Sequence, residues 1–362
     1  MLTRRGKDFL GFIVLNLVLA LGGAIALGGL RVSQVPLSLE GNPSPLGYFR
    51  SLALFVIPCL IFGTWLVRMD RDPARRRSFY LTVGVLTPIG ALLDIFLGKY
   101  FFVFPNTDAV LGSLHPVFRI PAFDWKHGLA GLLGPGWVPG YIPIEEFLFY
   151  ALGFTCILLT YIWCEAVLFG DDKSDRQQPV PRVFQNAWSA AGSCLGVGAL
   201  LFAIGYAVHR HLQEEPRGFP GYYLFLLISA VIPSMICFRV AFHFVHWRAL
   251  TVAWLFVLSI SQFWEASLGL PYQWWDYQHG TMLGIFIRPH CDLPIEALLV
   301  WFLGSWTTVM VHETVLAGIR LRAATGKSVL RILMGEIEDM DTAKAREEAV
   351  RRPPDSRERS HP

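Results

Sequence analysis

The sequence predicts an all-α integral membrane protein with about eight transmembrane helices in two parallel four-helix repeats. Three observations support this. Of the 362 residues, 53% are hydrophobic and only 16% are charged, and the mean hydropathy is +0.44. A soluble domain carries about 25% charged residues. Apolar runs of about 20 residues, enough to cross a bilayer, recur along the chain. The motif Pro-Ile-Glu opens two of these runs, at Pro143 and at Pro294.

Hydropathy gives the expected spans, with boundaries good to a few residues. They cover residues 8–30, 47–67, 78–99, 142–169, 185–208, 221–243, 249–270 and 293–318. The first run could be mistaken for a signal peptide, but its apolar stretch is too long and no small-residue cleavage site stands out. We therefore expect it to be the first membrane span.

The basic residues predict the orientation of the chain. The segments before the odd-numbered spans, together with the tail, carry more Lys and Arg than the connections on the other side, and the densest group is Arg75-Arg76-Arg77. The positive-inside rule then puts both termini in the cytoplasm of a multi-pass cell-membrane protein. The net charge of +3 is small and gives no reason to expect nucleic-acid binding.

The chain divides into three predicted parts. Residues 1–170 form the first four-helix repeat and residues 185–320 the second. Residues 321–362 form a cytoplasmic tail, largely disordered because its apolar density falls and its charges rise, with a short surface helix at 327–334.

Acidic residues mark corresponding positions in the two repeats. Asp94 near the end of the third span corresponds to Glu265 in the seventh, and Glu145 at the start of the fourth span corresponds to Glu296 in the eighth. Glu146 follows Glu145 directly. Acids in membrane helices are costly unless something holds or uses them. Proline and glutamate are also ordinary helix-start residues. Capping, however, does not require acids at both ends of a repeated loop, and we expect these to be functional.

The loop between the acids is aromatic in both repeats, at 100–105 and at 272–277. Such residues form interfacial belts in many membrane proteins, but beside acids they can also line a pocket whose rings stabilise a cation. The candidate substrate-binding residues are Phe102, Phe104, Phe149, Trp274, Trp275 and Tyr277.

Histidines and cysteines do not predict a metal site. His243 and His246 have helical ligand spacing, and His312-Glu313 lies deep in the eighth span, but no further residues complete a di-iron or zinc set. The six cysteines show no zinc or redox spacing. We expect these histidines to be interfacial or core residues.

The paired pattern resembles the integral-membrane carotenoid (lycopene) cyclase domain of actinobacteria, archaea and fungi, in which two such units form the enzyme. The matching residues of the first unit are Asp94, Phe102-Val-Phe-Pro105, Leu111-Gly112 and Pro143-Ile-Glu-Glu146. Those of the second unit are Glu265, Trp275-Asp-Tyr277, Leu283-Gly-Ile285 and Pro294-Ile-Glu296. The resemblance covers the two helix–loop–helix cores, less than half of the chain.

The chain departs from the family pattern in three places. Ala297 stands where the second glutamate of the pair is expected, and Glu265 replaces an aspartate. The first loop carries an insertion at 115–140, with Asp124, Trp125 and His127. These departures bear on the substrate more than on the reaction type.

The resemblance implies a proton-initiated ring closure of a linear polyene end group, without a cofactor. The substrate would be a hydrophobic carotenoid or another prenyl chain that arrives from the bilayer. The implied catalytic residues are Glu145 or Glu146 as the acid with Asp94 as partner or base, and Glu296 with Glu265 or Asp276 as a related set. Such an acid must keep its proton near neutral pH. Burial and like-charged neighbours favour this, whereas a helix N-terminus opposes it.

Two other interpretations stay open at this point. One is a transporter or lipid-binding protein with a site between the repeats, for which acids in mid-span and broken helices are typical. The other is a cyclase or hydratase that acts on another prenyl chain. The sequence leaves open the polyene, the ring type, the number of ends cyclised, and whether the protein is a monomer or a homodimer.

Overall fold

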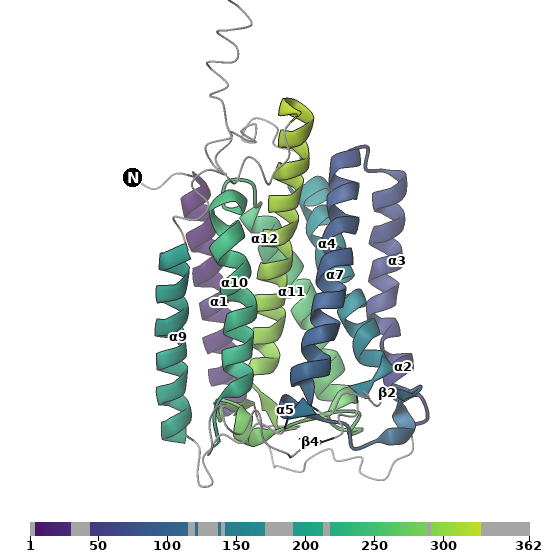
Figure 1. The fold of residues 1–362 in the computed structure, drawn as a ribbon, viewed down its shortest axis with the longest axis vertical. Helices are drawn as coiled ribbons and strands as arrows, with labels where there is room; N and C mark the ends of the chain where they lie inside the picture. Colours follow the sequence, from purple (N-terminus) through teal and green to yellow (C-terminus); the bar gives the residue numbers. More distant parts are fainter. Residues whose placement is uncertain are drawn as a thin grey trace, which may run out of the picture.

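The protein is a bundle of long helices with short strands and loops gathered at one end (Figure 1). The computed structural model describes residues 4–29, 44–114, 120–121, 137–138, 142–170, 191–212, 218–287 and 291–326. The predicted tail beyond 326, including its surface helix, lies outside these residues.

The long helices are α1 (Arg4–Gly29), α3 (Ala53–Arg68), α4 (Pro73–Leu93), α7 (Ile144–Trp163), α9 (Ala191–Leu212), α10 (Gly221–Ala241), α11 (Trp247–Trp264) and α12 (Glu296–Thr325). The short helices are α2 (Gly47–Ser51), α5 (Lys99–Phe101) and the 3₁₀ turns η2 (Thr107–Ala109) and η6 (His279–Thr281). Three π-helical turns are η1 (Asp94–Gly98), η3 (Cys164–Leu168) and η5 (Glu265–Gly269). The strands are β1 (Phe102–Val103), β2 (Ser113–Leu114), β3 (Ile120–Pro121), β4 (Trp137–Val138), β5 (Ile142–Pro143), β6 (Asp276–Tyr277), β7 (Phe286–Ile287) and β8 (Leu293–Pro294).

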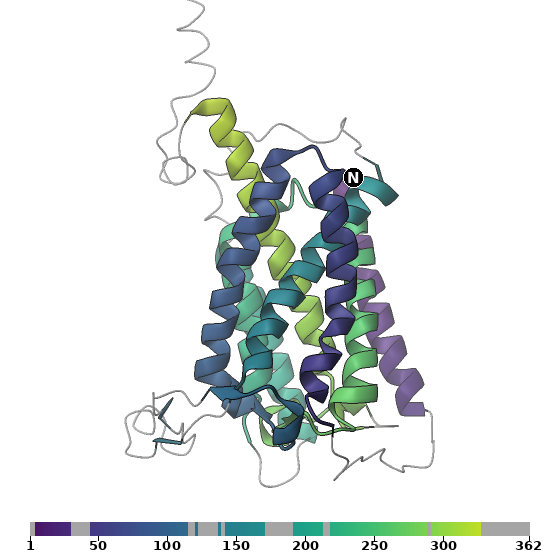
Figure 2. The same ribbon diagram turned by 90° about the vertical axis from the view of Figure 1, so that its right-hand side faces the viewer.

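Six helical segments of the described chain are long and apolar enough to cross a membrane, which confirms an all-α membrane-type fold. They are Gly47–Arg68, Pro73–Gly98, Ile144–Leu168, Ala191–Leu212, Gly221–Ala241 and Trp247–Gly269. The predicted number of eight stays a prediction. The other two helices, α1 and α12, run alongside the six in both views (Figures 1 and 2).

The outer surface of the bundle is apolar. Leu60 and Phe263 have exposed fractions of 64% and 60%, and other large apolar side chains of α3, α4 and α9 are exposed in the same way. Such a surface suits hydrocarbon rather than water.

Helix α4 begins well before the predicted start at residue 78. Asp72 caps it by accepting hydrogen bonds from the backbone N–H groups of Ala74 (2.9 Å) and Arg75 (3.3 Å), and Pro73 occupies the first helical position. Both are strong helix-start signals. The hydropathy pattern missed this turn because it is rich in arginine.

Corresponding elements of the two halves make corresponding contacts. Strands β1 and β6 pair antiparallel, with Phe102 opposite Tyr277 and Val103 opposite Asp276, so corresponding segments of the two halves meet each other. The packing of α4 on α12 matches that of α11 on α7, and the packing of α3 on α7 matches that of α10 on α12. This relation is the one expected of parallel repeats.

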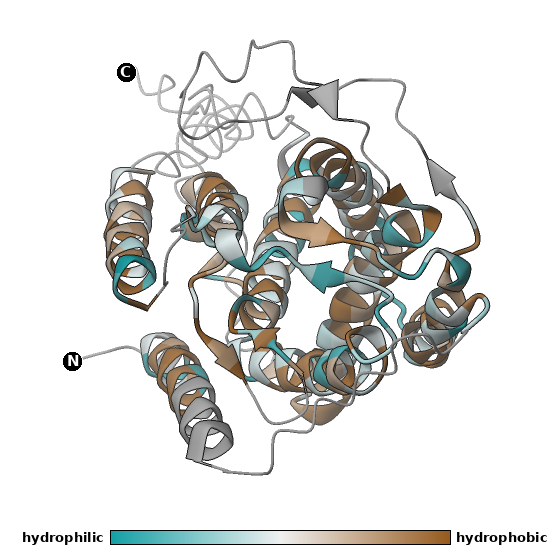
Figure 3. Cartoon of the chain, turned by 90° about the horizontal axis from the view of Figure 1, so that it is seen from below, coloured by the Kyte–Doolittle hydropathy of each residue, from teal (hydrophilic) through white to brown (hydrophobic). Residues whose placement is uncertain are grey.

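The first helix of each predicted repeat does not follow this symmetry. Helix α1 packs against α11, whereas α9 packs against α10, and both lie on the same flank of the bundle (Figures 1 and 3). The symmetric part is therefore a core of six helices.

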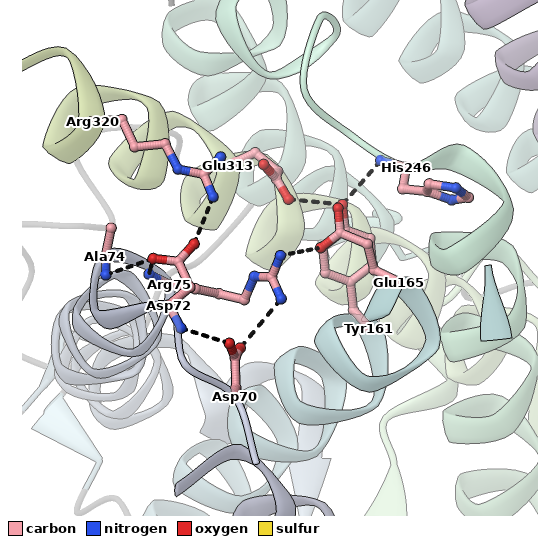
Figure 4. A network of polar contacts seen from close by, with 9 residues as sticks. All are labelled: Asp70, Asp72, Ala74, Arg75, Tyr161, Glu165, His246, Glu313 and Arg320. Carbon is pink, nitrogen blue, oxygen red and sulfur yellow. Dashed lines mark hydrogen bonds and ion pairs between the residues drawn. The ribbon is translucent and has the colours of Figure 1, made fainter. Parts of the chain in front are cut away.

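A buried polar network holds together the end of the bundle opposite the strands (Figure 4). The Arg75 side chain is only 4% exposed and contacts Asp70 (3.2 Å) and Glu165 (3.8 Å). The Tyr161 hydroxyl donates to Glu313 (2.8 Å) and accepts a hydrogen bond from the backbone N–H of His246 (3.0 Å).

Helix α12 is tied to this end by an ion pair of 2.7 Å between Arg320 and Asp72. Burial alone would raise the pKa of Asp72, but the Arg320 guanidinium and the backbone N–H groups at the start of α4 lower that pKa below its ordinary value. Helix α1 starts and α12 ends at this same end (Figure 1), so the strands and acidic loops lie at the opposite end.

Candidate functional site: buried carboxylates at the loop end

Asp94 and Glu265 each begin a π-helical turn at the end of a long helix, η1 after α4 and η5 after α11. Both side chains are buried. In η1 the carboxylate lies over the backbone of Gly98, where a Cβ atom would overlap with it. Single π-turns inside helices are frequent at functional sites. The sequence placed the acids correctly but gave no sign of these turns.

Glu145 and Glu296 make the same hydrogen bond in the two halves. Oε1 of Glu145 accepts from the backbone N–H of Leu111, and Oε1 of Glu296 accepts from that of Leu283, both at 2.5 Å. Both glutamates have an exposed fraction of 0%. The Leu-Gly motifs of the loops therefore supply the N–H that fixes each glutamate. In each case the second oxygen, Oε2, is buried and has no hydrogen-bond partner within the described residues.

Glu146 adds a third acid to the first half. Its Oε1 accepts a hydrogen bond of 2.5 Å from the hydroxyl of Tyr48 in α2, and both side chains are buried. Asp94 and Glu145 are close enough to Glu146 to interact with it electrostatically. We call Asp94, Glu145 and Glu146 the first carboxylate cluster. Ala297 leaves the other half without such a third acid.

The second carboxylate cluster consists of Glu265 and Glu296, and it differs from the first. Both oxygens of Glu265 are bonded, Oε2 by the Tyr277 hydroxyl (2.7 Å) and Oε1 by Nε1 of Trp301 (3.2 Å). Burial and the Glu265 carboxylate raise the pKa of Tyr277 well above its ordinary value, so its hydroxyl stays a donor. In contrast, Oδ2 of Asp94 is buried and has no hydrogen-bond partner in the described chain. The two clusters thus occupy corresponding positions in the two halves but differ in their hydrogen bonds.

A group of aromatic rings packs against Tyr48, which binds Glu146 of the first carboxylate cluster. The Trp264 ring lies 4.6 Å from Trp275 and stacks on Phe149 at 5.7 Å, and Tyr48 lies 5.2 Å from Trp275 (centroid distances). The structure therefore brings the predicted residues Phe149 and Trp275 together. Trp264 and Tyr48 were not predicted as site residues.

The other predicted aromatic residues lie around this group. Phe102 contacts Tyr277 at 5.4 Å, and Phe104 is partly buried against the core. Trp274 stacks on Tyr48, and its Nε1 donates to Ser44 (2.8 Å). Asp276 is not brought to the acids. It is half-buried and accepts a hydrogen bond from the adjacent N–H of Tyr277, and no contact joins it to Glu265 or Glu296 in the described residues.

Tyr222 links the two clusters. Its ring lies 5.2 Å from Phe102 and 6.3 Å from Tyr277, and its hydroxyl interacts electrostatically with acids of both clusters. Tyr48 and Tyr222 both follow a glycine at the start of a span, Gly47 and Gly221. This repeated Gly-Tyr pair is the signal that could have predicted them.

The histidines have structural contacts. His246 Nδ1 accepts the backbone N–H of Ala249 and caps α11 (3.1 Å), and Nδ1 of His312 lies 3.1 Å from the hydroxyl of Ser78. Among the described residues no three His, Cys, Asp or Glu side chains are grouped to hold a metal ion. Asp124, Trp125 and His127 of the insertion lie outside the described residues, as does most of 115–140.

Comparison of the chain with protein-family models, with curated proteins and with solved structures found no match. The function must therefore be inferred from the residues of the site.

We predict that Gly269→Ala destabilises the protein by about 1–3 kcal/mol, the usual effect of overpacking. Gly269 ends η5, and a Cβ atom there would overlap with the ring of Trp275. The free energy of unfolding in detergent measures the effect. Gly84→Ala is the matched control, because its added methyl group has no described atom within 4 Å apart from its chain neighbours and its own helix backbone. Equal stability of the two variants would show that the Trp275 ring moves aside without cost.

Proposed function

We propose that this protein is a membrane-embedded carotenoid cyclase of the lycopene type, which closes a ring at the end of a linear polyene by proton transfer. The observation that carries the proposal is the first carboxylate cluster, which contains three buried acids. Among the described residues, one oxygen of Asp94 and one of Glu145 have no hydrogen-bond partner, and Glu146 binds Tyr48, which packs against a group of aromatic rings. Ring closure needs an acid, a base and a surface that stabilises a cation.

The geometry favours Glu145 as the acid. Its Oε1 is fixed by the N–H of Leu111, which leaves Oε2 to carry the transferred proton. Asp94 is the favoured base, because its Oδ2 is also unbonded by the described residues. Glu146 is held by the hydroxyl of Tyr48 and interacts electrostatically with both. The proposed reaction requires one acid of the cluster to hold a proton, and an apolar surrounding disfavours uncompensated charges.

The proposed reaction is an isomerisation and needs no oxidant or reductant. Glu145 gives a proton to the terminal double bond of the polyene, and the neighbouring double bond attacks the resulting cation to form the ring. Asp94 then removes a proton from the ring. One proton is gained and one lost, and proton exchange within the cluster restores the starting state. The rings of Trp264, Trp275 and Tyr48 stabilise the cation by their π-faces.

We also propose where the protein lies and how its substrate reaches it. The polyene enters from the bilayer, the protein resides in the cell membrane, and both ends of the chain face the cytoplasm, as the distribution of Lys and Arg favours. The two halves, roughly 1–170 and 185–320, act as fused repeats of one unit.

Pigment analysis tests the proposal. The chain is expressed in a bacterium that accumulates lycopene, beside the Glu145→Gln/Glu146→Gln variant and an Asp108→Asn control in the same loop region, where the carboxylate is exposed. Cyclic carotenoids should form with the native chain and the control but not with the double variant.

Unchanged lycopene with the folded native protein would contradict the proposal for this substrate. Supplying other linear prenyl chains then distinguishes a different cyclase or hydratase. Binding of such a chain without chemical change would favour a transporter or lipid-binding protein.

A further inference from the structure

The three consecutive arginines at the start of α4 have different surroundings. Arg75 points into the bundle and pairs with Asp70 and Glu165. Arg76 and Arg77 instead line a hollow of about 500 Å³ on the outside of the bundle, and within the described residues neither has an ion-pair partner.

The hollow lies where α3 ends and α4 begins, at the end of the bundle opposite the carboxylate clusters (Figures 1 and 2). Its other lining residues are Val67, Pro73, Tyr80 and Leu81. Val67, Tyr80 and Leu81 are large and have exposed fractions of 55%, 58% and 44%. One wall is therefore cationic, and the rest is apolar or aromatic.

Cations in the first turn of a helix are unfavourable, because the N-terminus carries the positive end of the helix dipole. The carboxylate of Asp72 caps α4 but is already paired with Arg320, and the first turn contains no further acid. For Arg75 the cost is offset by two buried carboxylates, but the described residues provide no such carboxylate for Arg76 and Arg77. An anion bound in the hollow would offset the unfavourable position of Arg76 and Arg77 near the helix N-terminus.

The structure assigns this hollow to a membrane phospholipid with an anionic headgroup. The phosphate of the lipid contacts the guanidinium groups of Arg76 and Arg77, which suit phosphate oxygens geometrically. The first part of an acyl chain lies along Val67, Leu81 and the ring of Tyr80. Basic hollows between membrane helices at the level of the headgroups bind acidic lipids in the same way. The positive-inside rule alone would explain why basic residues lie at this end of the bundle. It would not explain why two of them line a hollow with apolar walls.

The test measures lipid binding to the full-length protein in detergent by native mass spectrometry. The probes are phosphatidylglycerol and phosphatidylcholine with identical acyl chains. The native chain should prefer phosphatidylglycerol. Arg76→Gln/Arg77→Gln should weaken this binding about fivefold for each arginine, and hence roughly 20- to 30-fold for the pair. Arg76→Lys/Arg77→Lys, which keeps the charge, should retain most of the binding and so shows that the loss is not a folding defect.

Arg68→Gln/Arg71→Gln is the matched control, because both arginines are exposed on the same hairpin but do not line the hollow. It should change the affinity less than about twofold. The inference is overturned if the glutamine variant binds phosphatidylglycerol like the native chain, or if phosphatidylcholine binds as tightly. It is also overturned if soluble glycerol phosphate displaces the lipid at similar concentrations, since the hollow would then recognise phosphate without an acyl chain. None of these outcomes depends on cyclase activity.

Discussion

Glu145→Gln is expected to lower the conversion of lycopene by 10²- to 10⁴-fold, the usual contribution of a general acid. Glutamine keeps an amide oxygen that can accept the hydrogen bond from the N–H of Leu111, so the loop and the start of α7 stay in place. What the variant loses is the transferable proton at the second oxygen. The measurement is the initial rate of ring formation in membranes that contain matched amounts of protein.

The second half of the molecule provides the control for this experiment. Glu296 accepts the same bond from Leu283, at the same distance and with the same burial. However, Glu265, the counterpart of Asp94, is bonded at both oxygens by Tyr277 and Trp301, whereas Oδ2 of Asp94 has no hydrogen-bond partner among the described residues. Glu296→Gln should therefore lower the rate less than about tenfold. Because the two substitutions disturb equivalent hydrogen bonds, a structural defect would affect both alike.

Two outcomes would contradict this asymmetry. Equal losses in the two variants would show that both clusters carry out the chemistry, one at each end of a polyene or in turn. A loss only in Glu296→Gln would place the acid in the second carboxylate cluster. In either case the number of cyclised ends in the product of each variant shows how much of the reaction the unchanged half still carries out.

The acids were predictable from the sequence because membrane helices make them conspicuous. Asp94, Glu145, Glu265 and Glu296 interrupt apolar runs at corresponding positions, and the structure places all four in buried positions at one end of the bundle. The spans were predicted for the same reason, since a helix in hydrocarbon must be apolar over its length. The start of α4 was not predicted, because its first turns contain arginines. In a hydropathy pattern, charged residues at the end of a helix cannot be distinguished from loop residues.

The rings around the acids were only partly predictable. Trp264 and Trp301 lie inside apolar runs, where a tryptophan that packs in a core cannot be distinguished from one that donates to a carboxylate. Tyr48 and Tyr222 approach the acids from other helices, so the repeated Gly-Tyr pair marks them in the sequence but does not indicate which acids they approach. Asp276 shows the opposite case. It lies close to the second cluster in sequence, but strand β6 pairs it opposite Val103 and its side chain bonds the adjacent backbone.

Arg75→Leu is expected to destabilise the protein by about 3–5 kcal/mol, the usual cost of removing one partner of a buried ion pair. The Arg75 side chain is 4% exposed, and its removal leaves Asp70 and Glu165, which are 6% and 4% exposed, without their guanidinium. Buried carboxylates without compensation are far more costly than the apolar contacts that leucine gains. The free energy of unfolding, measured by denaturant titration in detergent without added lipid, gives the effect.

Arg77→Gln, two residues further along the same helix, is the matched control and should stay within about 0.5 kcal/mol of the native protein. The double variant Arg75→Leu/Glu165→Leu should recover part of the loss, because it removes one of the two stranded charges. If Arg75→Leu were as stable as Arg77→Gln, the network of Figure 4 would not hold α4 to α7 at this end. This end of the bundle would then be held by its apolar packing and by other polar contacts, among them the Arg320–Asp72 pair. The two neighbouring arginines thus separate a structural role inside the bundle from a binding role outside it, since one should affect stability and the other lipid affinity.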